Sequence, residues 1–255
     1  MVVGVSLVVL VTVIGVVVAV NRTSTSPPTR VATPTPQPVT PVSPVDASTQ
    51  LVADRGAVVF TDDFSDPLSG WRTVAALGDP GTSYVYVSGT YTVHGNGNLH
   101  HFAESPYGPS LSQIGVSMTA TQTAGAPAGA GFGVLCSRGL AAANLRYEFF
   151  VLAGPIWVIE RGDGAGTVPV ILKKGSSPVI PATSPLTVVG LCATEADGQT
   201  NRLALFINGK GVGDITDAAT SMPDNGWHGG LAVASRTPAV ATVTVSHVTE
   251  RDLTR

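Results

Sequence analysis

The sequence predicts an all-β domain, a two-sheet antiparallel β-sandwich or jelly roll, preceded by one transmembrane helix and a disordered linker. Runs of alternating apolar and polar residues recur from Val58 to Leu253, and each is closed by Gly, Pro, Asn or Asp. The 255 residues include 29 Gly and 19 Pro, and only 12% are charged, which favours turn-rich strands. No segment of this region shows a helical period of apolar positions.

The first expected element is an apolar segment from Val2 to Val20, VVGVSLVVLVTVIGVVVAV, which contains no charge. As a helix at about 1.5 Å per residue it would span about 28 Å, close to the bilayer hydrocarbon core of about 30 Å. Lipid offers no partner for backbone polar groups, so a crossing segment must be helical despite its many valines. We expect a retained signal anchor over residues 1–20. The alternatives are a cleaved secretory signal and a buried core segment.

The second expected element is a linker over residues 21–56, rich in Pro, Thr and Ser and without an aromatic residue. It cannot bury enough apolar area to offset its chain entropy, so we expect a disordered stalk. An extended polyproline geometry would let it reach on the order of 100 Å. A cytosolic proline-rich ligand is the alternative. No Lys or Arg precedes residue 20, so the positive-inside rule does not fix the orientation, and a missing upstream cytoplasmic part is one explanation.

The third expected element is the domain over residues 57–255, with roughly ten to twelve strands. Asn208-Gly209 and Asp197-Gly198 lie between alternating runs and predict tight hairpins, because their turns need positive φ. Closing so many short strands in one domain favours two packed sheets.

The charge composition excludes one class of partner. The net charge is −3 and the pI is about 5.9, so no basic surface is available to neutralise phosphates. We therefore expect no nucleic-acid partner, and a membrane contact only through the N-terminal helix.

The two cysteines, Cys136 and Cys192, both lie within predicted strands. If the anchor places the domain outside the membrane, an even cysteine count in an oxidising compartment predicts a disulfide. The bond would close a loop of roughly 56 residues and stabilise the fold by up to about 4 kcal/mol. Two free buried thiols are the alternative.

The stretch TDDFSDPLSGW, residues 61–71, has the character of a first strand followed by a turn. Asp66-Pro67 is typical of a turn, and Phe64 and Trp71 are apolar anchors. The sequence continues with GTYTV, then GVLC followed by YEFFVLAGPIWVI, and then Cys192 before the hairpin LFING.

This order of motifs resembles a family of bacterial extracytoplasmic domains with the concanavalin A-like, laminin-G-like jelly roll, near the keto-disaccharide hydrolase-like group. The resemblance covers Val58 to Leu253, and departs from the family at the short turn Ala153-Gly154-Pro155. It implies a membrane-anchored glycan-binding module, the ectodomain of a signalling protein, or part of a sugar hydrolase. Fold does not decide among these.

Catalytic signatures are absent from the sequence. A jelly-roll glycosidase would carry two carboxylates, usually in an E-x-D-x-x-E strand, and no such string occurs. Glu148 and Glu160 lie in neighbouring predicted strands, but Arg146 and Arg161 beside them favour surface ion pairs. Nucleophile, phosphate-loop and dinucleotide motifs are also missing.

Two metal hypotheses arise from clustered side chains. Asp62, Asp63 and Asp66 could bind structural calcium together with Glu250 and Asp252 if the first and last strands pair, although a solvated acidic edge explains them too. The other cluster lies in VHGNGNLHHF, whose Gly and Asn favour a loop rather than a metal site. It contains His94, His100 and His101.

Carbohydrate recognition would use aromatic rings flanked by polar side chains. In the predicted hairpin over residues 144–163, alternation places Tyr147 and Phe149 opposite to Arg146, Glu148 and Phe150. The ligand-binding candidates on the concave face are Arg146, Tyr147, Glu148, Trp157 and Arg161. We expect a noncatalytic, single-pass membrane protein whose extracytoplasmic domain binds carbohydrate or a cell-envelope component, with a sugar hydrolase or a sensory ectodomain as alternatives.

Overall fold

The computed structural model describes residues 53–73, 83–95, 100–123, 126–139, 145–163, 168–180, 185–218, 226–235 and 240–255. The chain divides into two units, Met1–Pro41 and Val42–Arg255, and every described residue belongs to the second. The predicted anchor lies outside the described residues, as does the predicted linker up to residue 52. Within the described ranges, no helix is long and apolar enough to cross a membrane.

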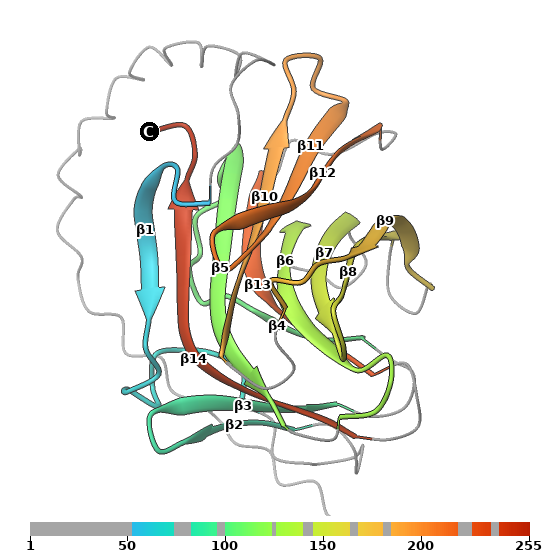
Figure 1. Cartoon of the computed structure of the whole chain (residues 1–255). Coiled ribbons are helices and arrows are strands. Elements are labelled where there is room, and N and C mark those ends of the chain that lie inside the picture. Colours follow the sequence, from blue (N-terminus) through green and yellow to red (C-terminus); the bar gives the residue numbers. More distant parts are fainter. Residues whose placement is uncertain are drawn as a thin grey trace, which may run out of the picture. The chain divides into compact units, whose positions relative to one another are not determined.

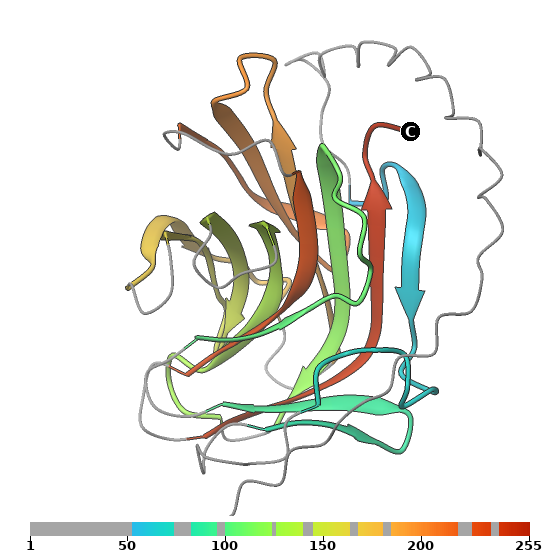
Figure 2. The same cartoon turned by 180° about the vertical axis from the view of Figure 1, so that it is seen from behind.

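The described residues form two antiparallel sheets that pack face to face, which confirms the predicted all-β sandwich (Figures 1 and 2). The eight-stranded sheet has the order β12-β11-β10-β5-β14-β3-β2, and β1 also pairs with β14. The six-stranded sheet has the order β4-β13-β6-β7-β8-β9. The strands of the first sheet are β1 (Ala57–Asp62), β2 (Ser83–Val87), β3 (Thr90–Gly95), β5 (Gln113–Gln122), β10 (Leu186–Thr194), β11 (Thr200–Ile207), β12 (Lys210–Ala218) and β14 (Ala241–Asp252). Those of the second are β4 (His100–Glu104), β6 (Gly131–Arg138), β7 (Leu145–Leu152), β8 (Ile156–Asp163), β9 (Val170–Ser176) and β13 (Trp227–Ala234).

The last strand, β14, organises the eight-stranded sheet. One of its edges pairs with β5, and the other pairs with β3 over Ala241–Val245 and with β1 over Val248–Asp252. Figures 1 and 2 both show β14 between β1 and β5. A bulge between Val245 and His247 marks the change of partner. The expected pairing of the first and last strands is therefore confirmed.

The tight turns follow the predicted chemistry. Asn208 and Gly209 have φ values of 50° and 74° and join β11 to β12, as a two-residue hairpin requires. Gly198, with φ of 67°, joins β10 to β11. One strand was missed, because its short sequence HHFAE follows a stretch rich in Gly and Asn: the expected loop at His100 and His101 is β4.

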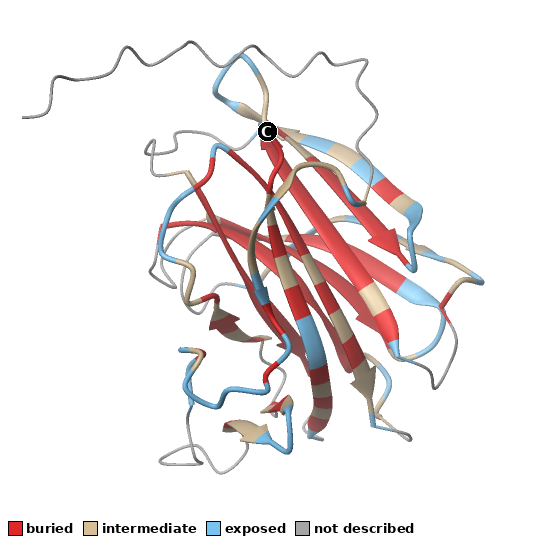
Figure 3. Cartoon of the chain, turned by 90° about the vertical axis from the view of Figure 1, so that its left-hand side faces the viewer, coloured by how far each residue is buried: buried red, intermediate tan, exposed pale blue. Residues whose placement is uncertain are grey.

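The two sheets differ in how their faces are covered. Buried and half-buried positions alternate along most of β14 in the eight-stranded sheet, whereas every residue of β6 and β13 is buried. Figure 3 shows the buried residues along the strands. One apolar cluster fills the space between the sheets, a second lies on the outer face of the six-stranded sheet, and a third lies on the outer face of the eight-stranded sheet. The second cluster consists of Leu135, Phe150, Leu152, Val158, Ala232 and Ala234, with Phe102 packed against it.

The predicted disulfide joins the two sheets. Cys136 in β6 and Cys192 in β10 are bonded, with their Cα atoms 6.5 Å apart. This confirms the pairing and removes the alternative of free thiols.

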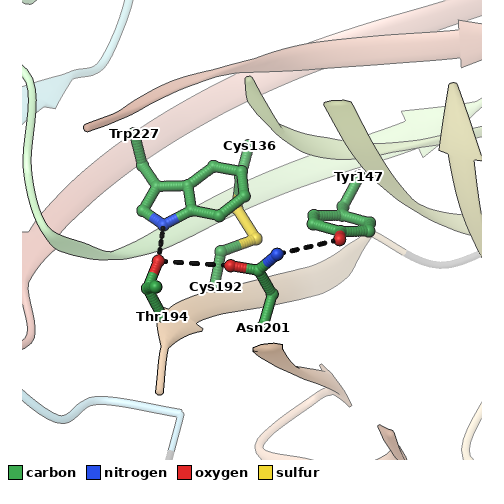
Figure 4. Close-up of a disulfide and its surroundings, with 6 residues drawn as sticks. All are labelled: Cys136, Tyr147, Cys192, Thr194, Asn201 and Trp227. Carbon is green, nitrogen blue, oxygen red and sulfur yellow. Dashed lines mark hydrogen bonds between the residues drawn. A yellow bond between two sulfur atoms is a disulfide. The ribbon is translucent and has the colours of Figure 1, made fainter. Parts of the chain in front are cut away.

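A chain of hydrogen bonds runs beside the disulfide and also crosses between the sheets (Figure 4). The Trp227 indole donates to Thr194 Oγ1 at 3.2 Å, and Thr194 Oγ1 donates to Asn201 Oδ1 at 3.2 Å. The Asn201 amide then donates to the Tyr147 hydroxyl at 3.1 Å. Tyr147 donates to Asp217 Oδ2 at 2.8 Å. These polar groups are satisfied inside the sandwich, so they contribute to holding the sheets in one arrangement.

The opening stretch TDDFSDPLSGW is organised by a single carboxylate. Asp62 accepts hydrogen bonds from the Phe64 backbone N–H at 2.7 Å, the Ser69 hydroxyl at 2.5 Å and the Trp71 indole at 2.8 Å. Phe64 adopts a positive φ of 59°, which is unusual for a bulky side chain. Its buried ring stacks on Tyr91 with centroids 5.3 Å apart, and this packing offsets the backbone strain.

Replacing Asp62 by alanine is expected to lower the free energy of unfolding by about 2 kcal/mol, because three donors lose their acceptor and the Trp71 N–H becomes buried and unsatisfied. Chemical denaturation of the variant measures this loss. Asp63→Ala is the matched control, since the Asp63 side chain is exposed and its hydrogen bonds come from the neighbouring Ser65. Equal midpoints for the Asp62 variant and the wild type would contradict the assigned role.

Candidate functional site on the outer face of the six-stranded sheet

A group of polar side chains lies on the face of the six-stranded sheet that points away from the other sheet. Cross-strand partners share a face of a sheet, and the pairs Ser137↔Arg146, His228↔Ser137 and Glu148↔Glu160 therefore point the same way. We call this group the outer-face cluster. It comprises His100, Ser137, Arg146, Glu148, Glu160 and His228.

Glu148 lies at the centre of the cluster and is 0% exposed. Its Oε1 accepts a hydrogen bond from Arg146 Nε at 2.7 Å, and its Oε2 lies 2.5 Å from His100 Nδ1. Burying a carboxylate away from water is costly unless charged or polar partners compensate. Both oxygens of Glu148 have such a partner.

The second carboxylate belongs to Glu160, on the neighbouring strand β8. It is 1% exposed, and its Oε2 lies 3.7 Å from His100 Nε2. The imidazole of His100 therefore lies between the two carboxylates. One ligand atom from each of the three residues lies within 4.8 Å of the others, and in the described part of the chain this is the only group of His, Cys, Asp or Glu with a spacing that could hold a metal ion.

Ser137 and His228 lie side by side in the same face. Ser137 is 5% exposed and His228 is 8% exposed, yet neither Ser137 Oγ nor His228 Nδ1 has a hydrogen-bond partner among the described residues. Burial lowers the pKa of His228 below its ordinary value, because the charged imidazolium loses hydration. A buried polar atom without a partner costs about 1–3 kcal/mol, so the two atoms mark a place suited to an external hydrogen-bonding group.

Small residues allow side chains from distant strands to meet in the cluster. In the sheet, β13 and β6 lie between β4 and β7. At the positions in register with His100, these two strands carry the small residues Ala234 and Gly131. At Gly133 the backbones approach so closely that a Cβ would strike the carbonyl of Phe149. Aromatic rings line the polar groups: Phe150 packs edge-on against His100 at 5.1 Å, and Phe102 lies 4.4 Å under the Arg146 guanidinium.

The five ligand-binding residues predicted from sequence do not share one face. Arg146 and Glu148 belong to the outer-face cluster, whereas Tyr147, Trp157 and Arg161 point between the sheets. Tyr147 and Trp157 are buried in the core, and Arg161 forms an ion pair with Asp217 at 3.0 Å. This corrects the expectation of a single concave-face set. The alternation of side chains correctly predicted which residues of β7 share a face, but alternation does not say which of the two faces contacts a ligand.

The expected surface ion pairs of Glu148 and Glu160 are also corrected. Glu148 does pair with Arg146, but the pair is buried. Arg161 points to the opposite face of β8 from Glu160 and pairs with Asp217 instead. The nearby opposite charges led to the expectation of exposed pairs. In the fold, His100 from β4 lies against both carboxylates.

The acidic residues considered for calcium do not gather into a common ligand set within the described residues. Asp62 accepts the three hydrogen bonds given above. Asp63 accepts a hydrogen bond from the backbone N–H of Ser65, and Asp66 accepts one from that of Leu68. Asp252 accepts from Thr254, whereas Glu250 is buried in the inter-sheet core beside Gly229. A structural calcium ion at these residues stays a prediction.

The three clustered histidines separate in the fold. His94 lies in β3 of the eight-stranded sheet, where its Nδ1 is 2.9 Å from Thr242 Oγ1. His101 is buried against Gly95. His100 alone reaches the outer-face cluster. The sequence signal that could have found this role is the alternation in HHFAE, which puts His100 and Phe102 on one side of a strand. Ser137 and His228 have no comparable signal.

Comparisons with known proteins define the class of fold. No protein-family model matches the chain, and no curated protein matches it in sequence. Its structure is similar to a Bacillus subtilis protein of unknown function with a galectin-like fold, at 11% identity over 78% of this chain and 97% of that one, with a TM-score of 0.52. The carbohydrate recognition domain of Emp47p is 13% identical over 80% of this chain and 99% of that one, with a TM-score of 0.51.

A third similar structure comes from work on endo-acting O-glycanases that human gut bacteria express to initiate mucin breakdown. It is 11% identical over 77% of this chain and 100% of that one, with a TM-score of 0.52. At such identities the similarity shows the fold alone. The described domain is thus a β-sandwich of the galectin-like kind.

Proposed function

We propose that this protein is a noncatalytic carbohydrate-binding module, held outside the cell membrane by the segment of residues 1–20, and that the outer face of the six-stranded sheet contacts the glycan. The anchor and the extracytoplasmic location rest on the sequence patterns described above. Carbohydrate recognition is supported by the fold, which the domain shares with the Emp47p recognition domain.

The observation that carries the proposal is the pair of unpartnered polar atoms, Ser137 Oγ and His228 Nδ1. A sugar hydroxyl both donates and accepts hydrogen bonds, so neighbouring hydroxyls of one ring could satisfy both atoms. Phe102 is half-buried at the same face, and an aromatic ring suits the apolar face of a pyranose. Arg146, the cross-strand partner of Ser137, adds a charged hydrogen-bond donor beside them.

The test is a glycan-array screen of the full-length chain in detergent, followed by binding measurements on the best ligand. Ser137→Ala is expected to weaken that binding about tenfold, because one hydrogen bond to the ligand is lost. The same substitution is expected to raise the free energy of unfolding of the unliganded protein by about 1 kcal/mol, because it removes a buried hydroxyl without a partner.

Ser246→Ala is the matched control, since Ser246 is an exposed serine on β14 of the other sheet. It is expected to change neither quantity. Binding of no glycan by the wild type, or equal affinity for the wild type and the Ser137 variant, would refute the proposed site.

A sugar hydrolase is the second candidate, and the pair of carboxylates on adjacent strands favours it. An oxygen of Glu148 lies within 4.8 Å of an oxygen of Glu160, near the separation of about 5–5.5 Å typical of retaining enzymes. We favour binding because both carboxylates are buried and Glu148 has both oxygens engaged, whereas a general acid must reach the glycosidic oxygen. Release of reducing sugar from a bound glycan, lost in Glu160→Gln, would favour the hydrolase instead.

A further inference from the structure

We propose that the outer-face cluster binds a divalent metal ion of the zinc class between His100 Nε2 and Glu160 Oε2, with Glu148 as the residue that positions His100. This inference does not depend on glycan binding. It follows from the way in which the imidazole of His100 lies between two carboxylates.

The first step concerns the proton on His100. Nδ1 lies 2.5 Å from Glu148 Oε2, and an ionised carboxylate can only accept a hydrogen bond, so Nδ1 carries the N–H. Glu148 is itself held by Arg146 Nε at 2.7 Å, which fixes the carboxylate in the accepting position. In the neutral imidazole, which is the form that binds a metal ion, this tautomer presents the lone pair of Nε2 on its opposite side.

The second step concerns what faces that lone pair. Glu160 Oε2 lies 3.7 Å from Nε2, too far for a hydrogen bond. In this tautomer two electron-rich atoms face each other across that gap. A zinc ion bound at about 2.0–2.1 Å to each would need them about 3.4 Å apart in tetrahedral geometry, so a shift of a few tenths of an ångström would suffice.

The third step concerns the surroundings. A histidine that binds a metal through one ring nitrogen usually donates its other N–H to a carboxylate, and Glu148 with Arg146 supplies that arrangement. The His100 side chain is 11% exposed and the Glu160 side chain 1% exposed, so water screens the interaction little. Imidazole and carboxylate together suit zinc, whereas calcium prefers six to eight oxygen ligands. Water would complete the coordination of the zinc ion.

The experiment uses the full-length chain in detergent, purified without a polyhistidine tag and stripped with EDTA. Calorimetric titration with Zn²⁺ is expected to show one saturable site per chain, and titration with Ca²⁺ none at this site. His100→Ala is expected to abolish the site, and Glu160→Gln to weaken it at least tenfold. Glu148→Gln is expected to weaken it about 10- to 100-fold, as for other residues that orient a metal-binding histidine.

The control is His247→Ala, because His247 is the exposed histidine on β14 and the natural place for adventitious zinc. Its loss should leave the saturable site unchanged. A titration lost in this control and kept in His100→Ala would overturn the proposal, as would calcium binding at the same residues or the absence of saturable zinc binding.

A second measurement needs no variant and therefore does not depend on any variant folding. Nitrogen-15 NMR of the histidine rings in the wild-type protein should show a large zinc-dependent shift of His100 Nε2, while Nδ1 keeps its proton. An unchanged His100 ring in saturating zinc, or loss of the Nδ1 proton, would contradict the proposed geometry.

Discussion

Replacing both Cys136 and Cys192 by alanine is expected to lower the free energy of unfolding by about 4 kcal/mol. The disulfide joins residues 56 positions apart, and the entropy of the unfolded chain rises when so long a loop is released. A loss of this size is a large fraction of the net stability of a domain. The disulfide also links the two sheets covalently. In the double variant, only noncovalent contacts such as the hydrogen-bond chain from Trp227 to Tyr147 hold this region together.

The measurement is chemical denaturation with and without reductant. The oxidised wild type should unfold at the highest denaturant concentration, and reduced wild type should approach the double variant. Reductant should not affect the variant, which has no other cysteine. If the oxidised and the reduced wild type unfold at the same denaturant concentration, the disulfide does not stabilise the fold as predicted.

Glu250 is expected to make the fold less stable as the pH rises from about 4.5 to about 7. It lies in β14 and is 0% exposed, so its carboxyl group is removed from water. Burial raises the pKa of Glu250 from 4.5 to about 7, against a smaller opposing effect of Ser105. The carboxyl group packs beside Gly229, where a Cβ would collide with it.

The sign follows from proton linkage. The folded state binds the proton more tightly than the unfolded state, so the stabilisation is fully present below about pH 4.5 and is lost as the pH rises through about 7. The difference between the two pKa values corresponds to about 3 kcal/mol. Glu250→Gln keeps the shape of the protonated acid and cannot ionise.

Unfolding free energies of the wild type and Glu250→Gln should therefore be compared across this pH range. The variant is expected to match the wild type near pH 4.5 and to be more stable by about 3 kcal/mol at pH 8. Subtracting the two curves removes the contribution of all other titrating groups. A difference that stays constant with pH would show that Glu250 does not titrate in this way.

Local patterns predicted the elements whose causes are local. The hairpin at Asn208-Gly209 was predictable because its backbone needs positive φ at both residues. β7 was predictable because a strand alternates its side chains, and this alternation is enough to place Tyr147 and Glu148 on opposite faces. β4 was missed because five residues after a Gly- and Asn-rich stretch give too short a pattern.

The candidate site was harder to predict because its members come from five strands. His100 lies 48 positions from Glu148 in the sequence. In the sheet, their strands β4 and β7 are separated by β6 and by β13, which comes from near the end of the chain. Glu160 was interpreted as a surface residue because its neighbour Arg161 is charged, but alternation sends the two side chains to opposite faces of β8.

The amino-acid sequence by itself determined the all-β class, most of the strands, the hairpin turns and the disulfide partners, because period-two alternation, positive φ and an even cysteine count are properties of short segments or of composition. Only the tertiary structure decided which faces are buried and which polar groups meet. Alternation says that two side chains share a face, but burial of that face depends on segments far away in the chain. For this reason Glu148 and Glu160, each within two positions of an arginine in sequence, lie beneath the surface with His100 between them.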